Sequence, residues 1–454
     1  MTQLVNYVRL HSYVYFVLNL RVFMISKNMN RFFVFRFILI VCAILLTGPV
    51  IHAQTFETVS PEDAGFSSER LKRLSDMFNE YSEQQRIAGG VAMVLRDGKV
   101  LFQESFGYRD VESAERMTMD SMFRIASQTK AITSVGIMIL QEEGKLLIND
   151  PVSKYMPEFA QTKVAVARDD GSGYDVVDAR RQITIRDLLT HTAGISYGYG
   201  PAQELWREAG MQGWYFAHRD EPVRETIRRL ASLPMDAHRG EKFVYGYSTD
   251  ILGALIEVVS GLSLYEFISE KILAPLSMND THFYVPDYKH DRVATVYSAT
   301  PSRGIERAPD PGFGVGQGHY THGPKVSYSG GAGLISTAND YARFLQMLLN
   351  GGELDGIRIL SPKTVELLTV NHLVDVHFRN GEGISLAFDV LMDVGARGTP
   401  GSVGDFGWGG AYHSTYWVSP KDRLVVVFFT QLIPSTGSDI QGKIRTLLYQ
   451  AMID

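Results

Sequence analysis

The sequence predicts an α+β fold in which one antiparallel sheet is built from both ends of the chain and a mostly helical lobe is inserted between them. Two strand-rich stretches carry this prediction, residues 90–103 near the N-terminal end and residues 416–430 near the C-terminal end. The residues between them are mainly helical patterns and loops that contain glycine and proline. A single sheet with a helical insertion is the simplest arrangement of that order, and a cleft between the two lobes is the expected place for a site.

The composition is that of a globular protein. The chain has 454 residues, of which 45% are hydrophobic and 21% are charged, enough for one large or two ordinary domains. The formal net charge of −6 at pH 7 gives no reason to expect nucleic acid as a partner. The one cysteine, Cys42, lies in an N-terminal apolar run, so we expect no thiol nucleophile in the mature protein.

The N-terminal region predicts export. An apolar run at residues 37–46 follows two arginines and has the length of a signal-peptide core, which is too short to span a bilayer comfortably. Small and polar residues follow it and end at Ala53, where we expect cleavage. Residues 1–53 are therefore expected to form an extension and signal peptide, and the mature protein to be periplasmic or secreted. An uncleaved anchor is the alternative, and it would be the only membrane contact.

Local signals place the first elements of the sheet lobe. Ser67 or Ser68 is positioned to cap a helix, and the residues that follow put apolar side chains on one side of it. These side chains are Leu71, Leu74, Phe78 and Tyr81. The Asp97-Gly98 pair between two apolar runs predicts a hairpin over residues 90–103.

The middle of the chain is predicted to be helical. One helix runs from about Ser127 to Glu143 and stops at Gly144. Thr184 to Asp187 has the pattern of a capping box that opens a short helix. Two further helices are expected at residues 250–260 and 339–349, and long loops occupy much of residues 200–335.

The C-terminal part returns to strands. Residues 416–430 predict a hairpin that turns at Pro420 to Arg423, and a helix from about 440 to 452 follows, with Ser438 or Asp439 as its cap. The mature domain, residues 54–454, then divides into two lobes. The α/β lobe comprises about 54–125 and 336–454, and the helical lobe about 126–335.

Ser127 and Lys130 form the only Ser-x-x-Lys sequence in the chain, at the expected start of a helix. Residues three apart share a helix face, so the hydroxyl and the amine can touch. Such a pair can make a serine nucleophilic without a histidine, provided that the lysine can exchange a proton, which burial among the following apolar residues favours. The alternative is an ordinary amphipathic helix with a solvated lysine.

Two other segments could supply partners. Tyr245 precedes the helix expected at 250–260, and a phenol beside a lysine ammonium can relay a proton. Residues 404–413 are rich in glycine and precede a strand, where glycines let the backbone approach a ligand and direct an N–H toward it. A core tyrosine and a plain β-turn are the alternatives.

Together these segments resemble the serine β-lactamase, penicillin-binding protein and esterase superfamily, and most of all the class C β-lactamases and the carboxylesterases built like them. The resemblance covers about residues 60–450 and is supported by residues 183–194, 272–281 and 329–337. It implies a β-lactamase/transpeptidase-like fold, no metal and no cofactor. It also implies Ser127 as acyl-enzyme nucleophile, Lys130 as its base or proton partner, Tyr245 as the shuttle to the leaving group, and an oxyanion hole from the N–H groups of Ser127 and Ala411.

Two positions depart from the β-lactamase pattern. A class C enzyme has Tyr-x-Asn at the second motif, whereas Tyr247 stands here in place of the asparagine. The third motif there begins with lysine, whereas Trp408 offers one donor and no cation. Losing a charge-assisted hydrogen bond of roughly 1.5–3 kcal/mol costs about ten- to a hundredfold in recognition, so both changes favour a neutral acyl substrate. The candidate substrate contacts are Tyr247, Trp408, Gly409, Gly410, Tyr412 and His413, with simple packing as the alternative for the last two.

Other motifs are weaker. Ser196 lies in a Gly-x-Ser-x-Gly sequence, but the strand before it and helix after it that a nucleophile elbow needs are not predicted. The glycine-rich run 312–318 has no surrounding βαβ unit, and a flexible loop is the better interpretation. His319 and His322 lack an evident third metal ligand, and His191 is read as structural.

The sequence therefore predicts a serine hydrolase that acts on small-molecule carboxylic esters. The first alternative is a β-lactamase or D-amino-acid peptidase acting on β-lactams or cell-wall peptides. Acyl transfer to an alcohol other than water is another, and a catalytically idle binding or sensor module of the same fold is the non-enzymatic alternative. The oligomeric state and the natural substrate are left open.

Overall fold

The computed structural model describes residues 56–454 with the exception of 303 and 374. The chain divides into two compact units, Met1–Gln54 and Thr55–Asp454, and the described residues belong to the second. The predicted extension and signal peptide, with Cys42, lie outside the described residues. Within the described part, no single helix has the length and apolar character of a membrane span, although the bent pair Ser248–Ser260 and Leu264–Leu273 passes by length and composition together.

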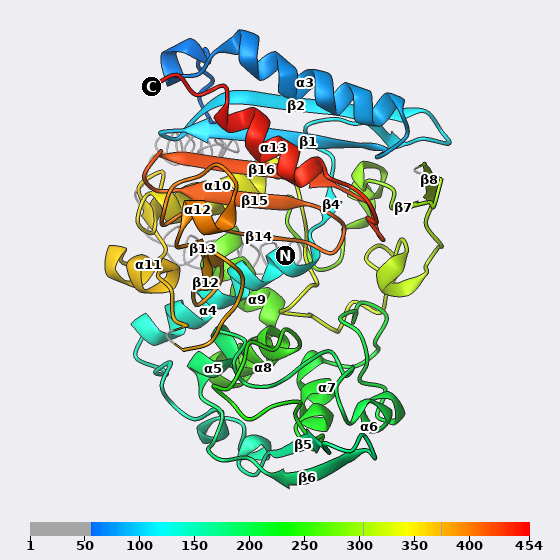
Figure 1. Ribbon diagram of the computed structural model, residues 1–454, viewed down its shortest axis with the longest axis vertical. Helices are drawn as coiled ribbons and strands as arrows, with labels where there is room; N and C mark the ends of the chain where they lie inside the picture. Colours follow the sequence, from blue (N-terminus) through cyan, green and yellow to red (C-terminus); the bar gives the residue numbers. More distant parts are fainter. Residues whose placement is uncertain (1–55, 303, 374) are drawn as a thin grey trace, which may run out of the picture. The chain divides into compact units, whose positions relative to one another are not determined.

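An eight-stranded antiparallel sheet forms the centre of this unit (Figure 1), with the order β12-β13-β14-β15-β16-β1-β2-β3. The chain's two ends meet in it, because β1 pairs with β16 from Gly90 opposite Thr430 to Arg96 opposite Leu424. This confirms the predicted sheet from both termini. The strands are β1 (Gly89–Arg96), β2 (Lys99–Asp110), β3 (Glu115–Arg116), β12 (Glu382–Ile384), β13 (Asp389–Leu391), β14 (Phe406–Gly409), β15 (Thr415–Ser419) and β16 (Leu424–Thr430).

Alternating side chains of the central strands feed two separate cores, as the two-residue period of a strand requires. On β16, Val426 and Phe428 pack with the helices α3 (Ser68–Glu83) and α13 (Ile440–Tyr449). The neighbouring Val427 and Phe429 pack on the other face with α10 (Ala338–Leu349) and α4 (Thr129–Glu142). Helices therefore cover both faces of the sheet, and α4 is buried over most of its length.

The inserted lobe is helical, with a small hairpin at its edge (Figure 1). Its helices are α5 (Ile185–Leu189), α6 (Gln203–Glu208), α7 (Val223–Leu230), α8 (Ser248–Ser260) and α9 (Leu264–Ile268). Its hairpin is β5 (Lys163–Ala167) with β6 (Tyr174–Asp178). A second hairpin, β7 (Tyr297–Ala299) with β8 (Ile305–Arg307), packs instead with the core that β16 shares with α3 and α13. The capping box at Thr184 and Asp187 is present, and Gly261 closes α8 in a left-handed conformation.

Short elements complete the described chain. The remaining strands and α-helices are β4 (Phe123–Arg124), β9 (Ile335–Ser336), β10 (Glu353–Leu354), β11 (Ile357–Arg358), α11 (Pro362–Thr369) and α12 (Val394–Arg397). The 3₁₀ turns are η1 (Glu62–Ala64), η2 (Ala126–Gln128), η3 (Val152–Lys154), η4 (Pro157–Phe159), η6 (Asp287–Arg292) and η7 (Phe313–Val315), and η5 (Ser269–Leu273) is a π-helical turn.

Asp439, one of the two predicted caps, is the N-cap residue of the last helix, but its side chain does not act as a cap. Helix α13 follows Asp439, but that carboxylate makes no capping hydrogen bond to the helix. It instead accepts from Tyr81 and forms ion pairs with Arg86 at 2.8 Å and Lys443 at 3.0 Å. The Ser438 hydroxyl contacts His413 at 2.8 Å. The side chains of Asp439 and Ser438 are thus engaged by α3 and by the turn after β14 instead of by the first turn of α13. The sequence alone does not show these contacts.

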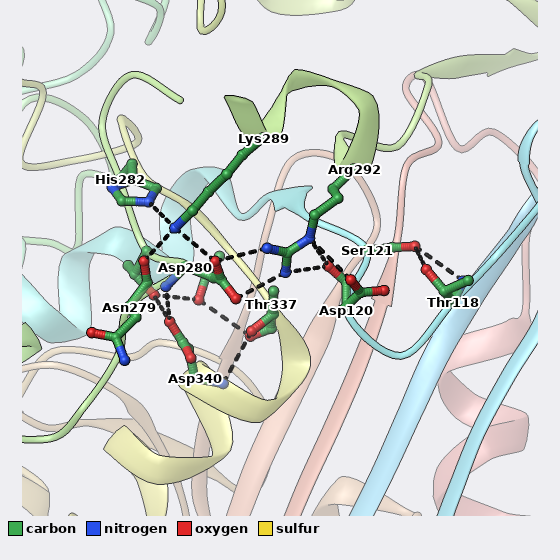
Figure 2. Close-up of polar contacts among 12 residues, drawn as sticks. Thr118, Asp120, Ser121, Asn279, Asp280, His282, Lys289, Arg292, Thr337 and Asp340 are labelled. Atoms are coloured by element: carbon green, nitrogen blue, oxygen red, sulfur yellow. Dashed lines mark hydrogen bonds and ion pairs between the residues drawn. The ribbon is translucent and has the colours of Figure 1, made fainter. Parts of the chain in front are cut away.

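A buried polar network fixes the segment that leads back into the sheet (Figure 2). Asp280 forms ion pairs with Lys289 at 2.7 Å and Arg292 at 2.8 Å, and its N–H donates to Asp340 at 2.7 Å. Burial raises the pKa of Asp340 to about 7. Next to this network, the His282 N–H donates to Ile335 of β9, and β9 pairs with β4. The network therefore supports the strand that precedes Ser127.

Candidate active site

Ser127 lies in the 3₁₀ turn η2, directly before α4, rather than in the α-helix itself. The preceding Ala126 has φ of 43°, in the left-handed region that a residue with a side chain rarely adopts. Neighbouring contacts hold this backbone, since the Ile125 N–H donates to Leu334 at 3.0 Å and the Tyr341 hydroxyl donates to the Gln128 carbonyl at 2.8 Å. Ser127 is partly exposed among buried neighbours, so its hydroxyl is presented at the surface of a rigid turn.

Lys130 is buried and its amine meets three oxygen atoms. Nζ lies 2.7 Å from the Gly331 carbonyl, 3.1 Å from the Tyr197 hydroxyl and 3.5 Å from Ser127 Oγ. An ammonium has three donors and no acceptor, so this set matches its donors in number. The predicted contact between serine and lysine is therefore present, and the lysine is not solvated.

Tyr245 comes from the loop before α8 and lies beside the lysine. Lys130 Nζ is 4.6 Å from the centre of the Tyr245 ring, and Trp408 Nε1 donates to the Tyr245 hydroxyl at 3.1 Å. His191 packs against the same ring, with 4.8 Å between centroids. The structure thus brings together the three motifs, which are separated by more than a hundred residues in the sequence.

The glycine-rich turn after β14 comes close to the segment before the serine. A Cβ added to Gly410 would lie 2.5 Å from the Ile125 carbonyl oxygen, so only glycine fits without a shift. Gly410 also donates its N–H to Ser414 at 2.8 Å, which fixes the turn that carries Ala411. Among residues 56–454 as described, no acceptor pairs with the N–H of Ser127 or Ala411. Two free donors near one serine are what an oxyanion hole requires.

Burial contradicts two of the predicted substrate contacts, Tyr247 and Tyr412, and His413 has its polar contacts with α13 and the segment before it. Tyr247 is fully buried, stacks with Trp206 at 6.0 Å and donates its hydroxyl to Gly213. Tyr412 is also fully buried, in a small core that includes Ala126. His413 turns toward α13, where it contacts Ser438 and Gln441. Trp408, Gly409 and Gly410 remain partly exposed.

Two contacts of Lys130 were missed by the sequence analysis. Tyr197 lies next to Ser196 in the Gly-x-Ser-x-Gly sequence, and burial raises the pKa of its phenol well above the ordinary value, with Tyr245 and Asp250 adding to the effect. Ser196 itself accepts from the Gly198 N–H at 3.0 Å in an irregular turn, without the strand and helix of a nucleophile elbow. The other missed contact, the Gly331 carbonyl, has no side-chain signal at all.

The remaining histidine motifs form no metal centre in the described part of the chain, where no group of three or more His, Cys, Asp or Glu side chains could hold an ion. His319 Nδ1 pairs with the Tyr215 hydroxyl at 2.9 Å. Burial lowers the pKa of His191 to about 3, with the Lys130 charge adding to the effect, so its imidazole is neutral at pH 7. Its role against the Tyr245 ring is packing rather than proton exchange.

A sheet flanked by helices, with a Ser-x-x-Lys pair at the start of the central helix, defines the β-lactamase/transpeptidase fold class. The chain belongs to the β-lactamase family, whose family model matches residues 74–451. Protein Rv1367c of Mycobacterium tuberculosis is 34% identical over 373 residues, which cover 78% of this chain and 88% of the relative. Esterase EstB of Burkholderia gladioli is 30% identical over 372 residues, which cover 79% and 89%.

A solved structure gives the same assignment. EstCE1, described as a hydrolase with promiscuous acyltransferase activity, superimposes with a TM-score of 0.72 at 27% identity, over 84% of this chain and 99% of that one. The predicted superfamily and fold class are therefore confirmed, and the protein is a β-lactamase-family serine hydrolase of the carboxylesterase-like branch.

Proposed function

We propose that this protein hydrolyses carboxylic esters of small molecules through an acyl-enzyme formed on Ser127. The observation that carries the proposal is the single cluster of Ser127, Lys130 and Tyr245, with the lysine amine 3.5 Å from the serine oxygen and 4.6 Å from the centre of the phenol ring. A buried lysine beside a phenol can accept, hold and return a proton. The amines and phenols of this cluster need no histidine or metal to do so.

The proposed steps follow from these positions. Ser127 Oγ attacks the acyl carbon and its proton passes to the Lys130–Tyr245 pair, while the N–H groups of Ser127 and Ala411 hold the oxyanion. The pair then protonates the departing alkoxide, which leaves as an alcohol. Water attacks the acyl-enzyme in the second half, with the same groups taking its proton and returning one to Ser127.

The preference for esters over β-lactams rests on Trp408. Its one donor is used on the Tyr245 hydroxyl, and its indole carries no charge to meet a β-lactam carboxylate. Tyr247 fills the other β-lactam-binding position with a buried ring. EstB, named an esterase, is a relative of this chain, which adds support.

The proposal is tested by comparing hydrolysis of a p-nitrophenyl ester with that of a chromogenic cephalosporin, for the wild type and Ser127→Ala. We expect the ester to be turned over faster and the variant to lose at least 99% of that activity. Full activity in Ser127→Ala would refute the acyl-enzyme, and a much faster cephalosporin would favour the β-lactamase alternative. Acyl transfer, which the description of EstCE1 suggests, is measured in the same assay by adding an alcohol acceptor.

We also propose that the protein is exported, because residues 37–46 have the pattern of a signal-peptide core. N-terminal sequencing of the protein recovered from expressing cells tests this, and an N-terminus upstream of residue 37 would contradict cleavage after Ala53.

A further inference from the structure

Asp250 is a buried carboxylate on α8 that the proposed reaction leaves without a role. Its side chain is fully buried, and one of its oxygens, Oδ1, accepts from Ser329 Oγ at 2.6 Å and from the Gly331 N–H at 3.1 Å. The other oxygen, Oδ2, has no hydrogen-bond partner among the described residues. A buried carboxylate with one unpaired oxygen is costly, so its position calls for an explanation.

Gly331 connects this carboxylate to the lysine of the site. Its N–H donates to Asp250, while its carbonyl accepts from Lys130 Nζ at 2.7 Å. A Cβ on this residue would lie 2.5 Å from Asp250 Oδ2, so a side chain does not fit between the two groups. Hydrogen bonds also fix the backbone on both sides of Gly331. On one side the Ala332 N–H donates to Ser329 Oγ at 3.1 Å, and on the other Thr133 Oγ1 donates to the Gly330 carbonyl at 2.8 Å.

The two charges also act on each other. The pKa of Asp250 is raised overall, because burial outweighs the Lys130 charge and the hydrogen bonds from Ser329 and Gly331, which lower it. An attraction that favours the ionised carboxylate equally favours the protonated amine, because both depend on the same pair energy.

The other titratable groups near this pair do not provide a second carboxylate. Asp250 also faces Tyr197 and Tyr247, and Arg219 from the loop after α6. Lys130 also faces Tyr197, Tyr245 and His191. None of these groups around Lys130 is a carboxylate, so Asp250 is the carboxylate in this set.

We propose that Asp250 is a positioning residue for this active site, which holds Gly331 so that its carbonyl fixes Lys130 beside Ser127, and whose negative charge keeps Lys130 an ammonium. This inference rests on the proposed function, because it assigns a support to the same lysine. A lysine held as an ammonium cannot take the serine proton. The Tyr245 oxygen then takes that proton while its own hydroxyl proton passes to the leaving alkoxide, and Trp408 Nε1 and the ammonium support the negative charge that develops on the oxygen in between.

The test is Asp250→Asn, which keeps the size of the side chain and an oxygen for Ser329 and Gly331 but removes the charge. The full-length enzyme is assayed on a p-nitrophenyl ester from pH 5 to 10. We expect kcat to fall at least tenfold with KM within about twofold, and the alkaline limb of the kcat profile to move to lower pH. A residue with only a structural role would not move that limb.

The matched control is Glu257→Gln on the same helix. Glu257 is a partly buried carboxylate, and it accepts from the Leu264 N–H at 3.0 Å, away from the lysine. Burial raises its pKa as it does that of Asp250. We expect this variant to keep the kcat and pH profile of the wild type.

Two results would overturn the inference. One is a kcat and pH profile of Asp250→Asn equal to those of Glu257→Gln. The other is a higher kcat near pH 7 with the acid limb moved to lower pH, which would show that a neutral Lys130 is the base. If Asp250→Asn does not fold, Ser329→Ala is the deciding variant, because it removes a hydrogen bond to Asp250 but leaves its charge. We expect Ser329→Ala to lower kcat and to leave both limbs of the kcat pH profile in place. An unchanged kcat in that variant refutes the positioning role of Asp250. Activity that survives Ser127→Ala would instead refute the proposed function itself.

Discussion

Replacing Trp408 with phenylalanine removes the indole N–H that donates to the Tyr245 hydroxyl and leaves an aromatic ring in place. Trp408 Nε1 lies 3.1 Å from that hydroxyl, and the two rings are 5.6 Å apart. Phe378 also stacks on the indole, with 6.2 Å between ring centroids. The smaller ring preserves most of this packing, so the change isolates the hydrogen bond.

The expected loss follows from how the bond changes during the reaction. Only the part of an interaction that strengthens on the way to the transition state changes kcat. A hydrogen bond to a neutral group contributes about 0.5–1.5 kcal/mol and one to a charged group about 1.5–3 kcal/mol. If negative charge develops on the Tyr245 oxygen, the gain is about 1–1.5 kcal/mol, which corresponds to an approximately 5- to 15-fold fall in kcat.

The assay is steady-state hydrolysis of a p-nitrophenyl ester, with kcat and KM measured separately. Trp417→Phe is the control, because Trp417 packs on the opposite face of the sheet with α3 and α13. We expect Trp417→Phe to keep kcat, and Tyr245→Phe to lose more than Trp408→Phe does. An unchanged kcat in Trp408→Phe, or a fall confined to KM, would refute the idea that the indole supports the phenol oxygen.

Two further predictions concern the oxyanion turn and the buried network. Gly410→Ala should lower kcat about a hundredfold, as loss of one oxyanion donor does, because the added Cβ would lie 2.5 Å from the Ile125 carbonyl and displace the turn. Gly409→Ala, with 3.4 Å to its nearest neighbour, is the matched control, and equal kcat values for the two would contradict this. For Asp340, the pKa of about 7 exceeds the ordinary value of 3.8, so its contribution to stability is greatest below pH 4 and is lost as pH rises through 7. We therefore expect the free energy of unfolding of Asp340→Asn, measured with urea, to rise relative to that of the wild type by up to about 4 kcal/mol between pH 4 and 8. A difference between the two proteins that stays constant with pH would contradict the raised pKa.

The fold was predictable where a local signal fixes local geometry. Asp97-Gly98 turns the first hairpin as expected, and the capping box at Thr184 opens α5. The sheet from both termini was predictable because its strands read as apolar runs at the two ends. The position of Asp439 as the N-cap of α13 was also predictable, but its missing capping hydrogen bond was not. Its carboxylate pairs with Tyr81, Arg86 and Lys443, and these contacts outweigh a capping preference of about 1 kcal/mol.

The candidate site divides in the same way. Ser127 and Lys130 are three residues apart, so helical geometry predicts their contact. Tyr197 and Gly331 meet the same amine from positions 67 and 201 residues away, and only the tertiary fold brings them there. Tyr247 was misassigned for a related reason. Its position in the motif suggested a substrate contact, but an aromatic cluster has room for its ring.

The exchange of lysine for tryptophan at the third motif affects recognition and acid–base chemistry together. A lysine there would bring a cation close to the Tyr245 hydroxyl, whereas Trp408 supplies a neutral donor at 3.1 Å. The cationic support of the phenol then falls to Lys130, and a nearby negative charge favours an ammonium at a buried position. Asp250 can provide that charge, because it is joined to Lys130 by two hydrogen bonds of Gly331, whose N–H donates to Asp250 and whose carbonyl accepts from Lys130. A site that has lost the third-motif cation should therefore depend more strongly on the carboxylate behind its remaining lysine.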